Sequence, residues 1–311
     1  MPLTKKLESN MAGANSLKTI FYALGANSAI AVAKLAAAVI TGSAAMLAEG
    51  IHSVADAGNQ LLLLLGIRQS QQPPTAKHPL GYGKNTYFWS FVVAIILFSV
   101  GGMFSIYEGW HKLHEPQALS HPWVAIGVLV FAILAETVSF RACIIEVNKI
   151  RRGRNFWRWF RDSRESELVV IFGEDLAALL GLLFALAAVV TTMLTGNPLF
   201  DALGTLMIGA LLIIIAILIA AEVKQLLLGQ SVEPMVLEQM QSFLREHADV
   251  EQLYSLITLH MGRDVMVSMK LKMREFNEQQ QMVAAINRLE VAFKQAFPQV
   301  VWSFVEPDNQ D

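Results

Sequence analysis

The sequence predicts a polytopic α-helical membrane protein with six transmembrane helices and a C-terminal cytoplasmic α+β domain. The first observation is composition: 54% of the 311 residues are hydrophobic and only 16% are charged, whereas soluble proteins carry roughly a quarter charged residues. The second is a set of apolar segments long enough to cross a bilayer. The third is a change after Gly229 to a more polar and regularly patterned composition.

Six segments have the length of about 20 residues that a helix needs to span the hydrocarbon, with few charges. They are residues 17–41, 43–67, 86–109, 122–147, 168–195 and 199–226. Very short connections join the first segment to the second and the fifth to the sixth, so each of these pairs is predicted to form a tight hairpin. The predicted division is a tail over 1–16, a transmembrane domain over 17–230 and a C-terminal domain over 231–311.

Lysine and arginine collect in the loops that would lie on one side of the membrane. The basic residues of the loops after the second and fourth segments are Arg68, Lys77, Lys84, Lys149, Arg151, Arg152, Arg154, Arg158, Arg161 and Arg164. The loops of the opposite side contain only Lys112. Because cytoplasmic loops are enriched in Lys and Arg, both termini are predicted to be cytoplasmic, in a multi-pass protein of the cell (inner) membrane.

The arginine-rich loop is interleaved with Trp157, Trp159 and Phe160. This pattern is compatible with RNA or anionic lipid as a partner. Membrane topology alone explains the charge, however, so no nucleic-acid partner is expected. The N-terminus carries some positive charge but no short apolar segment with a cleavage site, so it is interpreted as a cytoplasmic tail rather than a cleaved signal.

The C-terminal region predicts elements in the order α-β-β-α-β. Pro234 near the start of VEPMVLEQMQSFLREH suits the first turn of a helix. The runs YSLITLHMG and VMVSMKLKM are predicted strands around a turn at 262–264, EQQQMVAAINRLEVAFKQAF is a periodic helix, and VVWSFVEP is a last strand. This order fits a compact α+β domain with a small, antiparallel-rich sheet.

The second segment contains polar groups at helical spacing in SAAMLAEGIHSVADAGNQ. Glu49, His52 and Asp56 follow the i, i+3, i+7 pattern that places side chains on one helix face, and Asn59 extends this stripe. A charge at the bilayer centre costs at least roughly 2.5 to 3.5 kcal/mol, so such residues are functional candidates. His52 and Asp56, four residues apart, can converge on one cation if a second helix closes the shell.

The fifth segment offers carboxylates for that shell, Glu174 and Asp175 in VIFGEDLAALLG. Imidazole combined with carboxylates suits a tetrahedral Zn²⁺, while Mn²⁺ and Fe²⁺ stay open because affinity alone does not select among these ions. The alternative is a buried hydrogen bond between His52 and Asp56 that only holds two helices together.

Other ionisable residues in the segments have two interpretations each. Lys34 either neutralises a carboxylate in the bundle, which is favoured, or extends to the membrane interface. Asp201 is either the N-cap of the sixth helix or a carboxylate at the mouth of the pathway. Glu136 does not face Arg141 squarely across the helix and is expected to contact another span.

The first half of the chain resembles the cation diffusion facilitator family. The positions that carry the resemblance are Asn27, Lys34, Gly42, Ser43, Ala48, His52, Ser53 and Asp56, followed by HPLGYGK over 78–84. The runs GEDLAALLG and TGNPLFDALGT look most similar to the branch that contains the animal mitochondrial zinc exporter. The resemblance implies exchange of Zn²⁺ or a related divalent cation for H⁺ by a homodimer. It places His52, Asp56 and Asp175 on metal-binding positions.

The chain departs from the family pattern at three places. The fifth span commonly supplies a His four residues before its Asp, and this chain has Ile171 there, so Glu174, Glu49 or a water would have to complete the shell. Tyr82 stands where some relatives have a second His beside His78. The strand MKLKM replaces closely spaced His and Asp, and its lysines would repel a dication. A single transport site and a C-terminal domain without tight zinc binding are therefore predicted.

The predicted function is a proton-coupled divalent cation efflux transporter, with Zn²⁺ as cargo and no cofactor. Its candidate ligands are His52, Asp56, Glu174 and Asp175, and its candidate auxiliary or proton-coupling residues are Glu49, Asn27, Lys34 and Asp201. The alternatives are a Mn²⁺, Fe²⁺ or Co²⁺ transporter of the same family, and a metal-sensing or scaffold membrane protein without transport. An enzyme is not expected, since the sequence has no Ser/His/Asp set, phosphate loop or H-E-x-x-H.

Overall fold

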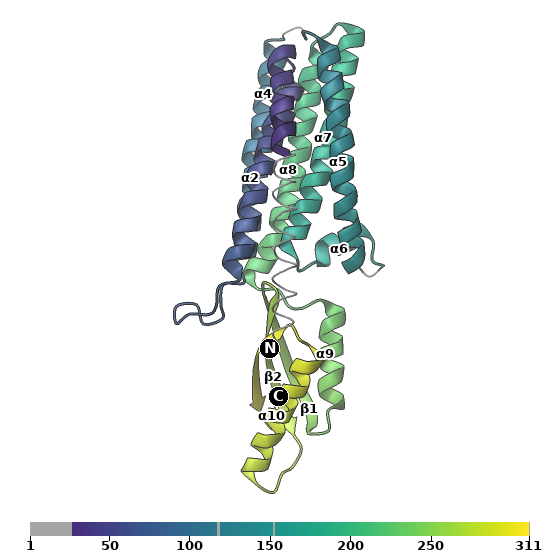
Figure 1. Ribbon diagram of the computed structural model, residues 1–311. Coiled ribbons are helices and arrows are strands. Elements are labelled where there is room, and N and C mark those ends of the chain that lie inside the picture. The colour runs from purple at the N-terminus through teal and green to yellow at the C-terminus, as the bar shows by residue number, and fades with distance from the viewer. Residues whose placement is uncertain (1–26, 117–118, 152, 311) are drawn as a thin grey trace. The chain divides into compact units, whose positions relative to one another are not determined.

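A computed structural model of the protein describes residues 27–116, 119–151 and 153–310 (Figure 1). The predicted tail over 1–16, the first ten residues of the predicted first span and Arg152 lie outside these residues. The described part of the first span is an apolar helix, Asn27–Thr41. It ends at Gly42, which has a φ of +67° and donates its N–H to the Ala38 carbonyl at 2.8 Å, the left-handed C-cap that glycine favours.

Four helices of the described chain are long and apolar enough to cross a membrane. They are Asn85–His114, Pro122–Ile150 (α5), Ser166–Thr195 (α7) and Leu199–Leu228 (α8). α2 (Ala44–Ser70) has the length of a span, but its polar stripe lowers its hydropathy. In Figure 1 these helices form an elongated bundle. The protein is therefore a helical membrane protein with a small C-terminal sheet domain.

The helix Asn85–His114, which covers the predicted third span, changes from α-helical to π-helical winding in its middle. It consists of α3 (Asn85–Ile96), a π-helical segment η1 (Leu97–Met103) and α4 (Phe104–His114). Gly102 and Gly109 of this helix lie directly against α8, because an added Cβ would come within 2.5 Å of Ile213 and 2.9 Å of Leu206. Small residues allow membrane helices to approach closely, and π segments often lie at functional sites.

The sequence did not predict α6 (Phe156–Asp162), a short helix in the arginine-rich loop between α5 and α7. It is N-capped by Asn155, whose side-chain oxygen accepts a hydrogen bond from the Arg158 N–H at 2.7 Å. Trp159 is buried, whereas Trp157 is exposed. The described arginines of this loop form contacts within the chain, for example Arg164 with the Ser231 carbonyl at 2.8 Å.

The C-terminal elements are α9 (Pro234–Glu246), β1 (Val250–Met261), β2 (Asp264–Met273), α10 (Gln279–Ala296) and β3 (Val300–Pro307). The predicted α-β-β-α-β order is thus confirmed. The sheet order is β1-β2-β3; β1 pairs antiparallel with β2, whereas β2 pairs parallel with β3. The sheet is therefore mixed, since α10 carries the chain back to the other end between β2 and β3.

The core of this domain lies between one face of the sheet and the two helices. Alternate residues of β2 are buried, as the period of two in a strand requires. They pack with side chains of α9 and α10: the cluster includes Val265, Val267, Met269, Leu271, Met240, Leu244, Leu289 and Phe293. The lysines of MKLKM therefore point to the other face, where Lys270 pairs with Asp308 at 3.1 Å and Lys272 with Glu251 at 2.6 Å.

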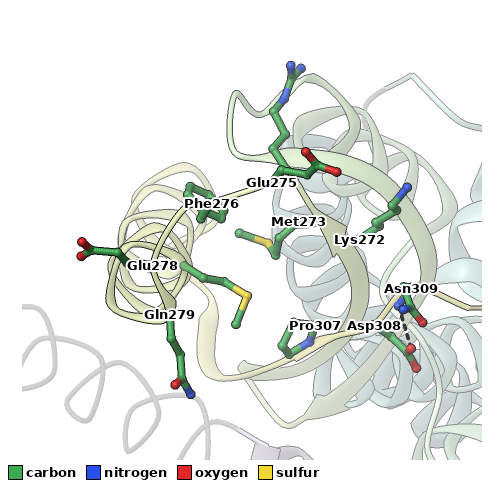
Figure 2. Close-up of a pocket in the computed structure, with 11 residues that line it drawn as sticks. Lys272, Met273, Glu275, Phe276, Glu278, Gln279, Pro307, Asp308 and Asn309 are labelled. Carbon is green, nitrogen blue, oxygen red and sulfur yellow. Dashed lines mark hydrogen bonds between the residues drawn. The ribbon is translucent and has the colours of Figure 1, made fainter.

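A pocket of about 510 Å³ lies at the end of β2 and the start of α10. Figure 2 shows Met273 and Phe276 near its centre and charged side chains such as Lys272, Glu278 and Asp308 around them. No candidate ligand from the membrane segments lines it. It is therefore not the site that the sequence predicts.

The described chain divides into two compact units whose boundaries cross the long helices. The first unit contains residues 27–64, 92–151 and 170–220, and the second contains 65–91, 153–169 and 221–310. Within the second unit, the Tyr87 hydroxyl of α3 donates to the Gly262 carbonyl and accepts from its N–H, both at 3.1 Å. All candidate ligands of the predicted metal site lie in the first unit.

Candidate metal site

α2 carries the predicted polar stripe on its buried face. Glu49, His52 and Asn59 are completely buried, and the Asp56 side chain is 14% exposed. Alanines at 44, 45, 48 and 55 are also buried, so neighbouring helices can approach α2 closely. The helical spacing read from the sequence therefore holds, and it places an imidazole and two carboxylates inside the bundle.

His52 lies beside Asp56 as predicted, with 3.5 Å between Nε2 and Asp56 Oδ2. The geometry is not that of a hydrogen bond, and neither ring nitrogen has a hydrogen-bond partner among the described residues. The π segment η1 passes next to the ring, because a Cβ added to Gly101 would lie 3.8 Å from His52 Nδ1. A buried polar group without a hydrogen-bond partner lowers stability by roughly 1 to 3 kcal/mol. A ligand that bonds to one of these ring nitrogens would therefore stabilise the site.

The two adjacent carboxylates of α7 face different neighbours. Glu174 Oε1 accepts a hydrogen bond from Asn59 Nδ2 on α2 at 2.6 Å, whereas Asp175 Oδ2 accepts one from Ser139 on α5 at 3.5 Å. α7 is a continuous α-helix here, so adjacent residues differ by about 100° around its axis. The described residues contain no group of three or more His, Cys, Asp or Glu close enough to hold a metal ion.

These carboxylates nevertheless share one electrostatic neighbourhood. Asp56 is within electrostatic range of Glu174, Asp175 and Glu136. Glu136, on α5, also acts electrostatically on Glu49 and Asp175. The expectation that Glu136 contacts another span stays a prediction, because only its electrostatic range, and no contact, is seen among the described residues. Its place beside the predicted ligands could not be inferred, because spacing along one helix does not show which helix lies opposite.

Lys34 forms a buried ion pair, as favoured from the sequence. Its Nζ lies 3.2 Å from Glu49 Oε2 and donates to Ser53 Oγ at 2.7 Å. The lysine is completely buried and does not extend to an interface. Glu49 Oε1 has no hydrogen-bond partner among the described residues and lies against Gly181 of α7, where a Cβ would meet it. One oxygen of Glu49 is thus already paired with the ammonium group of Lys34.

Asp201 caps a different helix from the one expected. It lies in the first turn of α8, but its carboxylate accepts hydrogen bonds from Ser43 Oγ at 2.5 Å and the Ala44 N–H at 2.7 Å. It therefore satisfies the N-terminus of α2. Of its two interpretations, the N-cap of its own helix was wrong, and the carboxylate at the mouth of the pathway stays a prediction. Asn197 is the residue whose side chain accepts from the Leu199 N–H at 3.0 Å. Asn27 is half-buried on the helix Asn27–Thr41.

The positions that depart from the family pattern have distinct surroundings. Ile171 is 36% exposed on α7. His78 packs against Tyr82 in the loop between α2 and α3, with ring centroids 4.6 Å apart.

His260 of β1 is half-buried, and its Nδ1 lies 3.3 Å from the Gly262 carbonyl. Burial lowers the pKa of His260, so the neutral form is favoured there.

Comparison with known proteins finds one matching family and several similar chains. Residues 20–228 match the family described as the cation efflux transmembrane domain. The proton-coupled zinc antiporter SLC30A9, mitochondrial, is 33% identical over 247 residues in Xenopus laevis and 32% identical over 250 residues in Homo sapiens; each match covers 79% of this chain and 44% of the relative. Metal tolerance protein C4 of Arabidopsis thaliana is 30% identical over 80% of this chain and 55% of its own length. The chain thus spans about half the length of these relatives.

Proposed function

The chain belongs to the cation efflux family, and from this premise we propose that it moves Zn²⁺ across a membrane in exchange for protons. The proposed site lies between α2 and α7, with His52, Asp56, Glu174 and Asp175 as candidate ligands. The observation that carries this proposal is the completely buried His52 imidazole, which lies beside Asp56 and has no hydrogen-bond partner among the described residues. Zinc is the cargo and not a resident cofactor.

The chemistry of these groups accounts for exchange against protons. Zn²⁺ binds neutral imidazole and ionised carboxylates, so metal and protons compete for the same atoms. In the outward-facing state, protons displace the metal from His52 and the carboxylates, and loss of those protons on the inner side allows the next ion to bind. Rocking of helices around a midplane site supplies alternating access. Lys34, Glu49, Asn27 and Asp201 are auxiliary residues in this scheme.

The proposal includes a topology of six spans, with the helices Asn27–Thr41 and α2 as the first two. It also includes cytoplasmic termini in the inner cell membrane, a membrane domain over 17–230, a cytoplasmic domain over 231–311 and a homodimer. The lysine and arginine distribution supports the orientation. The names of the animal relatives place those proteins in mitochondria.

One observation favours a second candidate cargo, Mn²⁺ or Fe²⁺. The site has a single imidazole because Ile171 occupies the position of the usual second histidine, and its remaining candidate donors are carboxylate oxygens. Manganese prefers a site made of oxygen donors to a site rich in nitrogen donors. Competition between the ions in a transport assay ranks these cargoes.

Zinc flux into proteoliposomes containing the purified full chain, under an imposed pH gradient, tests the proposal. The wild type is expected to show flux that follows the gradient, and Asp56→Ala and Asp175→Ala are expected to abolish it. Glu146→Gln is the matched control, because Glu146 is an exposed carboxylate on α5 that pairs with Lys149 at 2.6 Å. Its flux should equal that of the wild type.

The remaining outcomes separate the parts of the proposal. Zinc flux that does not depend on the pH gradient would contradict the proton coupling but not zinc transport itself. A wild type that carries none of zinc, manganese or iron would overturn the transporter proposal in favour of a metal-sensing or scaffold protein.

A further inference from the structure

α5 presents a stripe of polar side chains near α7. Glu136, Ser139 and Cys143 follow the i, i+3, i+7 spacing of one helix face. Ser139 donates to Asp175 Oδ2 at 3.5 Å, and Cys143 is buried and also within electrostatic range of Asp175. This stripe therefore adds a third helix to the neighbourhood of the candidate ligands on α2 and α7.

Glu136 is half-buried in a helix of 29 residues that has the composition of a membrane span. A carboxylate facing lipid at such a position is costly, so it is expected to face protein or a water-filled pathway. It lies within electrostatic range of the Lys34 ammonium and of the carboxylates of Glu49 and Asp56 on α2 and Asp175 on α7. Ser139, which is one helical turn from Glu136 and shares its face of α5, donates to Asp175, so this face of α5 is turned toward α7.

The other candidates for a fourth ligand each have a strong partner at one oxygen or lack a donor atom. Glu49 is held by Lys34 at 3.2 Å, and Glu174 is held by Asn59 at 2.6 Å. Ile171 has no donor atom. By contrast, Glu136 forms no hydrogen bond or ion pair with another described residue, and the completely buried His52 beside Asp56 has two nitrogens without hydrogen-bond partners.

We propose that Glu136 is the fourth ligand of the transported cation, completing from α5 a shell that His52 and Asp56 begin on α2 and Asp175 continues on α7. This inference rests on the proposed function and specifies its site. It replaces the imidazole missing at Ile171 by a carboxylate on a different helix. Because the described residues hold no assembled group of three ligands, the shell forms when α5 and α7 approach α2 around the ion.

Zinc binding to the purified full chain, measured by calorimetry, tests this role separately from transport. Glu136→Gln is expected to weaken binding by at least about 10-fold to 100-fold, the range measured even for groups that only support a ligand. Glu146→Gln, on the same helix, is expected to bind zinc like the wild type. Glu136→His, which keeps a donor at this position, is expected to retain binding and to shift the preference toward zinc over manganese.

The outcomes distinguish this inference from the function on which it rests. If Glu136→Gln binds zinc like the wild type while Asp56→Ala does not bind, the site exists without Glu136 and the inference is wrong. If the wild type itself binds no zinc, manganese or iron, both the inference and the proposed function are overturned. Should Glu136→Gln fail to fold, a folded Glu136→His that binds zinc and manganese with the same preference as the wild type would contradict the inference.

Discussion

Two sets of buried polar groups along α2 differ in how far they are paired with other residues. Near the start of the helix, Ser43 donates to Asp201, and one oxygen of Glu49 meets the ammonium of Lys34. Farther along, both nitrogens of His52 and one oxygen of Asp56 have no hydrogen-bond partner among the described residues. Buried polar groups are usually satisfied. Each group of the first set has a partner, although Glu49 Oε1 has none, whereas the His52 ring has no hydrogen-bond partner at either nitrogen and is available to a ligand.

The same difference separates two histidines of the chain. His260 in β1 has a ring nitrogen 3.3 Å from the Gly262 carbonyl and donates its backbone N–H to the Gln230 carbonyl at 3.0 Å. Neither ring nitrogen of His52 has a hydrogen-bond partner among the described residues. A buried histidine alone is therefore weak support for a metal site, and the absence of protein partners is the more informative property.

The largest effect on stability is expected from removing the ammonium group of Lys34, which pairs with Glu49. Lys34→Met leaves the Glu49 carboxylate buried without its cation, and removal of one partner of a buried pair costs about 3 to 5 kcal/mol. Thermal unfolding in detergent micelles should therefore show a strongly lowered midpoint. The double variant Lys34→Met with Glu49→Gln should recover most of the loss. A single variant as stable as the wild type would show that Lys34 does not stabilise the bundle.

A smaller effect is expected at Gly181 of α7, which lies against Glu49 of this ion pair. Gly181→Ala places a methyl group against Glu49 Oε1, and overpacking of this kind costs about 1 to 3 kcal/mol. Gly127→Ala is the matched control in α5, since a Cβ there has no atom within 4 Å. The control should be neutral or slightly stabilising, because alanine favours helix over glycine. Equal unfolding midpoints for the two variants would mean that α7 does not hold the Glu49 carboxylate in place.

Asp201→Ala tests the cap that joins α8 to α2. Loss of an N-cap side chain costs about 0.5 to 2 kcal/mol, and Ser43 would also lose its acceptor. Asn197→Ala removes the exposed cap of α8 itself and should cost less in the same detergent unfolding assay. If Asn197→Ala proves the more damaging change, the contact of Asp201 with Ser43 and Ala44 contributes little to stability.

Sequence reasoning predicted what depends on local pattern. The period of two in VMVSMKLKM correctly predicted a strand, and the spacing of His52 and Asp56 correctly placed them on one helix face. The partners of Asp201 and Glu136 depend on which helices lie side by side, which spacing along one segment does not encode. Opposite charge in the bundle was enough to favour an ion pair for Lys34, but not to identify Glu49 as its partner.

The smallest effect is expected at His260, the half-buried histidine that has a partner. Burial lowers its pKa below the ordinary value of 6.5, so the unfolded chain binds a proton more readily than the folded domain does. Stability is therefore complete above the unfolded pKa and is lost as the pH falls below it, by up to about 1 kcal/mol at pH 5.5. Hydrogen exchange of the β1 amides in denaturant, compared at about pH 7.5 and pH 5.5, should show this loss. His260→Asn should reduce the pH dependence by that amount, and an unchanged dependence in this variant would show that His260 titrates alike in the folded and unfolded chain.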